Sequence, residues 1–109
     1  LIGKNKQDML KAFNRMKEIG GGIVAVEKGK IIYELVLPLS GISSQLPFER
    51  LIIKEKEFKK IMKEKGYPFD DPIYTLLFFT STHLPYIRMT PKGVFDVMQK
   101  KVLFPSILR

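Results

Sequence analysis

The sequence of 109 residues contains no cysteine and no tryptophan, and it contains one histidine. Without cysteine the chain forms no disulfide, offers no thiolate nucleophile and cannot ligate zinc through sulfur. A single imidazole, that of His83, cannot build a zinc site from histidine and cysteine ligands, so any metal would need carboxylates. These absences argue against a metal site within this chain, and they are compatible with a reducing cytoplasm.

The sequence also lacks a long hydrophobic run. No stretch of about 18 uncharged apolar residues is present, so no membrane partner is expected. The hydrophobic share of 45% and the charged share of 28% are those of an ordinary globular protein, and the length predicts a single domain over residues 1–109. Because the chain opens on Leu1 without a signal pattern, we expect a truncated or processed product.

Acidic residues are too few to balance the basic ones, and the net charge is +8. A basic surface can supply non-specific affinity for nucleic acid. Much of the excess, however, lies in residues 54–65, where glutamates alternate with the lysines as on a solvated helix face. Nucleic acid is therefore not the expected partner.

Two apolar, β-prone runs within residues 20–44 flank Lys28 and Gly29. This pattern predicts a β-hairpin with a type I′ turn, in which Glu27 pairs with Lys30. Strict alternation would place these residues on one face of the hairpin: Val24, Val26, Ile31, Tyr33, Leu35 and Leu37. If the two helices pack on that face, the other face stays partly bare and becomes an interface. Alternatively, residues 73–79 pair beside the hairpin and a second hairpin covers the other face, which leaves a closed monomer.

Other elements follow from periodicity and from turn-forming residues. A helix over residues 5–19 begins at Asn5 with Asp8 in a capping-box arrangement, and a charged helix covers residues 47–65. Residues 1–3 resemble the end of a strand, and residues 102–109 are expected to cross a surface without forming a helix. Residues 73–79 form either a strand or a short helix capped by Asp71. Residues 85–90 and 94–98 predict a second hairpin.

The predicted fold class is therefore α+β, with a small antiparallel or mixed sheet built from two hairpins and two or three packed helices. No group of residues in the sequence forms a recognisable active site by itself. Asp70 and Asp71 are adjacent and suit capping or a turn better than acid–base catalysis. The three glycines at 20–22 follow a helix instead of preceding one, so they suit structure better than phosphate binding.

The order of several short motifs resembles the C-terminal domain of the adenine deaminases. That family shows a triple glycine, a hairpin, Leu-Pro-x-x-Gly-x-x-Ser, Asp-Pro followed by Thr-Leu, and Pro-x-x-x-x-Thr-x-x-Gly-x-x-Asp-Val. The matching positions cover nearly the whole chain: Gly20, Gly21, Gly22, Leu37, Pro38, Gly41, Ser44, Asp71, Pro72, Thr75, Leu76, Pro85, Thr90, Gly93, Asp96 and Val97.

This resemblance implies a parent hydrolase of the amidohydrolase superfamily, in which a metal-bound hydroxide converts adenine and water to hypoxanthine and ammonia. In the family the metal ligands lie on an N-terminal barrel, which this chain does not contain. The parent is expected to be cytoplasmic, to use a divalent metal (manganese, iron or zinc) and to form a homo-oligomer. The chain itself would be a non-catalytic accessory domain with the barrel as its partner.

Within the chain, the loop over residues 38–46 leaves the same hairpin whose second face is expected to be bare. We therefore expect Ser40, Gly41 and Ser44, with His83 as a weaker candidate, at an interdomain or subunit boundary or on a pocket rim. The alternative hypothesis is a stand-alone basic interaction module that binds nucleic acid or a protein partner.

Overall fold

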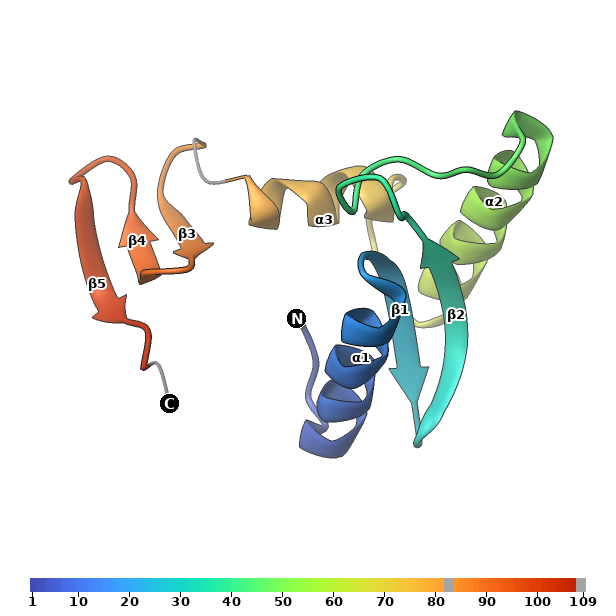
Figure 1. The fold of residues 1–109 in the computed structure, drawn as a ribbon, viewed down its shortest axis with the longest axis horizontal. Helices are drawn as coiled ribbons and strands as arrows, with labels where there is room; N and C mark the ends of the chain where they lie inside the picture. Colours follow the sequence, from blue (N-terminus) through green and yellow to red (C-terminus); the bar gives the residue numbers. More distant parts are fainter. Residues whose placement is uncertain (82–83, 108–109) are drawn as a thin grey trace. The chain divides into compact units, whose positions relative to one another are not determined.

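The computed structural model describes residues 1–81 and 84–107, which contain three helices and two antiparallel sheets (Figure 1). The α+β class is thus confirmed. The chain divides into two compact units, Leu1–Lys60 and Ile61–Arg109, and each is described by itself. The assignment of one domain to residues 1–109 stays a prediction. In the described part of the chain, no helix is long and apolar enough to cross a membrane.

Helix α1 (Lys6–Ile19) opens the first unit. The side chain of Asn5 accepts hydrogen bonds from the backbone amides of Gln7 and Asp8, and Gly20 ends the helix in the left-handed conformation (φ 75°). Both predicted helix ends are confirmed. The expected strand end over residues 1–3 is wrong, because this segment forms no strand.

Strands β1 (Gly22–Glu27) and β2 (Lys30–Val36) form the predicted hairpin. Lys28 and Gly29 both have positive φ (49° and 73°), as a type I′ turn requires, and Glu27 pairs with Lys30. The predicted faces are wrong beyond the first pairs. The register shifts between Ala25 and Val26 because Ile32 is an extra residue in β2, and one extra residue inverts the side of every later side chain.

The bulge changes what each face of the hairpin carries. Tyr33 and Leu35 now share a face with their partners Ala25 and Ile23, whereas Glu34 shares the opposite face with Val24. The expected common face for Val24, Tyr33 and Leu35 therefore does not exist.

Helix α2 (Phe48–Glu64) and α1 pack on opposite faces of the hairpin. Tyr33 contacts Phe58 of α2 with ring centroids 4.8 Å apart, and the neighbouring Glu34 binds Arg15 of α1. The expectation that both helices share one face and leave the other bare is wrong. The core of this unit consists of Tyr33, Leu35 and Phe58, which are 3%, 5% and 2% exposed. Phe48, the first residue of α2, is exposed.

In the second unit, α3 (Pro72–Thr80) resolves the choice left open for residues 73–79 in favour of a helix. The carboxylate of Asp71 caps it by accepting from the amide of Tyr74 at 3.0 Å. Strands β3 (Ile87–Thr90) and β4 (Gly93–Asp96) form the predicted second hairpin. Strand β5 (Lys101–Pro105), which was not predicted, pairs with β4. The two hairpins lie in separate sheets.

Candidate functional site

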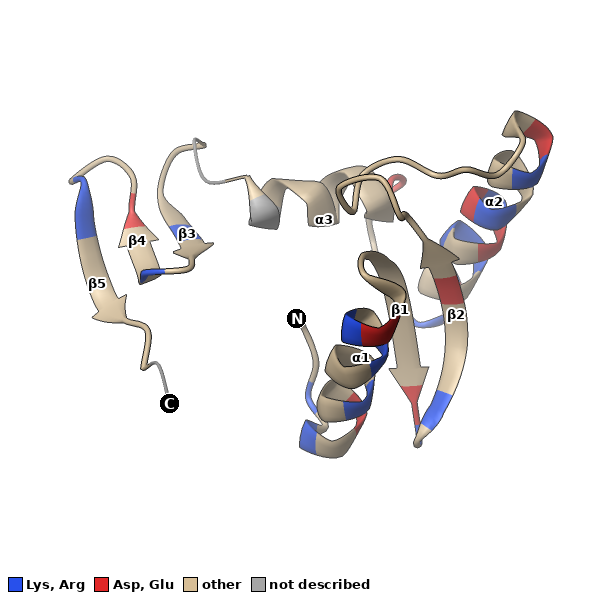
Figure 2. Ribbon diagram, in the orientation of Figure 1, with Lys and Arg blue, Asp and Glu red and all other residues tan. Residues whose placement is uncertain are grey.

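The connection between β2 and α2 is the most distinctive surface of the first unit. No charged residue occurs between Glu34 and Glu49, and Figure 2 shows this loop free of charge between a charged strand and a charged helix. Even so, its apolar side chains are exposed: Leu39 by 53%, Ile42 by 73% and Leu46 by 44%. An exposed, uncharged apolar segment in a chain with 28% charged residues is typical of an interaction surface.

Hydrogen bonds within the loop hold its shape. Leu39 and Ser43 form an isolated antiparallel bridge, and the amides of Ile42 and Ser43 both donate to the carbonyl of Leu39 at 3.1 Å. Ser40 and Gly41 make the intervening turn with positive φ (56° and 70°). A loop that is already ordered in this way loses little conformational entropy when it docks.

The loop lies close to the triple glycine. The carbonyl of Gly21 accepts from the amide of Leu37 at 3.0 Å, and a β-carbon added to Gly21 would lie 2.7 Å from the α-carbon of Gly41. A β-carbon on Gly22 would overlap the carbonyl oxygen of Leu35. The glycines therefore permit a close backbone crossing that positions the loop.

Ser44 lines a shallow groove of about 310 Å³. Its hydroxyl accepts from the amide of Leu46 at 3.0 Å, so it also stabilises the loop. The groove is lined by Glu34, Leu35, Val36, Pro38, Ser44, Gln45, Leu46 and Lys54. The structure thus separates the predicted residues: Ser44 lines this groove, whereas Ser40 and Gly41 form the turn and Gly41 lies at the glycine crossing. His83 lies outside the described residues.

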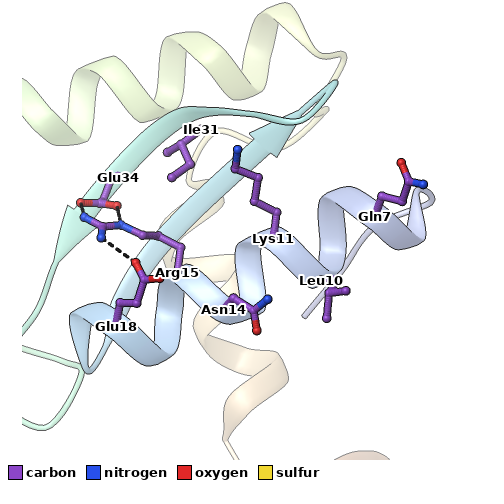
Figure 3. Close-up of a pocket in the computed structure, with 8 residues that line it drawn as sticks. All are labelled: Gln7, Leu10, Lys11, Asn14, Arg15, Glu18, Ile31 and Glu34. Carbon is purple, nitrogen blue, oxygen red and sulfur yellow. Dashed lines mark hydrogen bonds and ion pairs between the residues drawn. The ribbon is translucent and has the colours of Figure 1, made fainter.

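A second, larger groove of about 530 Å³ lies between α1 and β2 (Figure 3). The guanidinium of Arg15 donates to both carboxylate oxygens of Glu34, at 2.7 and 3.0 Å, and to Glu18 at 2.9 Å. These hydrogen bonds raise the pKa of Arg15 and lower the pKa of Glu34. Because Arg15 is paired with two carboxylates, the cluster ties the helix to the hairpin and leaves no free guanidinium for a ligand.

Sequence reasoning did not predict this ion pair. The available signal was Glu34 itself, a charged residue between Tyr33 and Leu35 in a strand that is otherwise apolar at its centre. The role of Asp8 also differs from the prediction. Its carboxylate does not complete a capping box but accepts from the amides of Lys28 and Gly29, at 3.0 and 2.7 Å, and so holds the turn of the hairpin.

The described residues do not form a metal-binding site. Over residues 1–81 and 84–107, no three histidine, cysteine, aspartate or glutamate side chains gather as a metal site would require. The carboxylates described above already have partners, Asp8 at a turn, Asp71 at a cap and Glu34 on Arg15.

Comparison with known proteins relates this chain to one family. The family model described as "Adenine deaminase C-terminal domain" matches residues 1–101. The chain is 61% identical to "Putative adenine deaminase YerA" of Bacillus subtilis and 56% identical to "Putative adenine deaminase BH0637" of Halalkalibacterium halodurans, over 99% and 100% of this chain. It is 36% identical to the "Adenine deaminase" of Bacillus pumilus over 88% of its length.

In the first two of these relatives the match covers 19% of the protein, and in the third 17%. The chain therefore spans about a fifth of the length of the curated relatives that it matches. The resemblance inferred from the order of its motifs is confirmed, and the chain belongs to the adenine deaminase C-terminal domain family.

Proposed function

We propose that this chain is the non-catalytic C-terminal domain of a metal-dependent hydrolase that deaminates adenine. The parent reaction is adenine and water to hypoxanthine and ammonia. The observation that carries the proposal is the family match over residues 1–101, in a chain that spans about a fifth of its relatives. The parent would act in purine metabolism in the cytoplasm as a homo-oligomer, properties carried over from the family resemblance.

The catalytic metal would lie outside this chain. The described residues do not offer a fitting set of ligands, since their carboxylates serve caps, turns and an ion pair. The divalent metal of the parent, manganese, iron or zinc, would therefore be held by the N-terminal domain.

The role left for this chain is to dock on that N-terminal domain through the 38–46 loop. Support comes from the loop's lack of charge, from the exposure of Ile42, and from the internal bridge that fixes its shape. Burying exposed apolar side chains against a second domain is favourable by about 25 cal/mol for each Å² removed from water. Ser40, Gly41 and Ser44 would then lie at the domain boundary.

The activity is tested by following ammonia release from adenine with manganese present. The full-length protein that contains this chain should release ammonia, whereas the 109-residue chain alone should release it no faster than buffer does. Turnover by the chain alone would show that the metal site has been placed wrongly. A full-length protein that binds the metal and is stabilised by it, but leaves adenine unchanged, would refute the proposed reaction.

The docking role is tested in the same full-length protein with Ile42→Asp. This change puts a charge on a side chain that is 73% exposed in the loop, and it should lower the thermal midpoint of the full-length protein while leaving that of the isolated chain unchanged. Leu10→Asp, at an α1 position that is 58% exposed, is the matched control. Equal effects of the two variants on the full-length protein would exclude a special role for the loop.

A further inference from the structure

The two outer edges of the β1–β2 hairpin differ in a way that matters for pairing. Strand β2 carries Lys30 and Glu34 and contains the bulge at Ile32, all features that discourage another strand from pairing with an edge. Strand β1 ends with Glu27 at the turn, opposite Lys30, but from Gly22 to Val26 it has no charge, no proline and a regular run of valine, isoleucine and alanine. One edge is therefore protected, and the other is left suitable for pairing.

The position of α1 points to the same edge. Helix α1 packs mainly against β1 and only slightly against β2, and Figure 1 shows it nearer to β1 than to β2. Helices that cover a sheet usually pack across neighbouring strands, because one strand alone offers too narrow an apolar surface. A helix that lies over β1 more than over the middle of the hairpin fits a sheet that continues beyond β1.

The hydrogen-bonding groups of that edge can be assigned from the ladder. Leu37 donates to the carbonyl of Gly21, so Gly21 turns its polar groups toward β2. In an antiparallel pair this direction alternates along the strand, which turns the amides of Gly22 and Val24 away from β2. On β2 the corresponding outward amides are those of Glu34 and Val36, their direct partners.

Among the described residues, β1 pairs with β2 alone. We infer that its other edge is completed by a β-strand from the part of the parent protein outside this chain. This inference rests on the proposed function, and it adds a second contact, made by the backbone, to the one made by the 38–46 loop. The curated relatives contain about four-fifths of their length beyond the matched region, which supplies the occupant. Because helices cover both faces of the hairpin, the incoming strand should be apolar on both sides.

Hydrogen exchange provides the test. The amides of Gly22 and Val24 are measured in the isolated chain and in the full-length protein, with those of Glu34 and Val36 as the matched control on the other edge. We expect exchange of the first pair to slow by about 100-fold or more in the full-length protein, because a paired edge opens only with the sheet, while the control pair changes little. Unchanged exchange at Gly22 and Val24 would overturn the inference.

A proline scan gives a second readout. Proline at position 24 removes an outward amide from β1, whereas proline at position 36 removes the equivalent amide from β2 without touching the inferred interface. Val24→Pro should lower the thermal midpoint of the full-length protein more than Val36→Pro does, and equal shifts would count against the pairing. If Val24→Pro unfolds the isolated chain, the proline scan is set aside. The inference is then decided by hydrogen exchange in the unmodified chain and the unmodified full-length protein.

Three further outcomes separate this inference from a second copy of the chain as the occupant and from the proposed reaction. Slow exchange at Gly22 that depends on the concentration of the isolated chain would assign the edge to a second copy and refute the inferred occupant. A full-length protein that deaminates adenine while this edge exchanges freely would refute only the strand pairing. A protected edge in a protein without deaminase activity would refute only the proposed reaction.

Discussion

Replacing Gly22 by alanine should disrupt the first unit far more than the same change at Gly29. Both glycines have positive φ, 141° and 73°, so each replacement strains the backbone by about 1–3 kcal/mol. A β-carbon at Gly29 meets nothing within 4 Å, whereas one at Gly22 overlaps the carbonyl oxygen of Leu35 and lies 3.2 Å from the amide nitrogen of Leu37. Backbone atoms of a paired strand cannot move aside without breaking the ladder.

We therefore expect Gly29→Ala to cost about 1 kcal/mol of unfolding free energy, and Gly22→Ala to cost at least about 3 kcal/mol, a large part of the stability of a small domain. Guanidinium denaturation followed by far-ultraviolet circular dichroism measures both values. Costs that agree to within about 0.5 kcal/mol would show that the strand crossing at Gly22 is not close, and the account of the triple glycine would fail.

Three other changes test the contacts of the first unit. Asp8→Ala should destabilise the hairpin by about 1–3 kcal/mol, because two turn amides, one from Gly29, lose a charged acceptor; an unchanged denaturation midpoint would contradict this role. The pKa of Glu34 is lowered by its hydrogen bonds to Arg15, so stability should be lost as the pH falls below about 4.5, and Glu34→Gln should flatten that loss in an acid titration of the midpoint. Burial raises the pKa of Tyr33 to about 12, so stability should fall as the pH rises from 10 toward 12, and absorbance titration should show a tyrosine in that range that Tyr33→Phe removes.

Local chemistry in the sequence was enough to predict several elements of this protein. Lys28 and Gly29 fixed the turn type and its register, and Asn5 and Gly20 fixed the ends of α1. The same holds for the cap at Asp71, since a side chain that bonds an amide three residues away needs no distant partner. The ordered motifs also identified the family, because they recur at matching intervals along nearly the whole chain.

Tertiary structure decided what depends on long-range partners. Nothing in the local pattern marks Ile32 as the bulged residue, yet that one extra residue sends Tyr33 toward α2 and Glu34 toward α1. Strand β5 exists because β4 offers it an edge. Gly41 lies against the glycines, whereas Ser44 lines a groove with residues of β2 and α2. Pairing and packing of this kind join residues far apart in the chain, so their outcome depends on which surfaces meet and not on the propensity of any one segment.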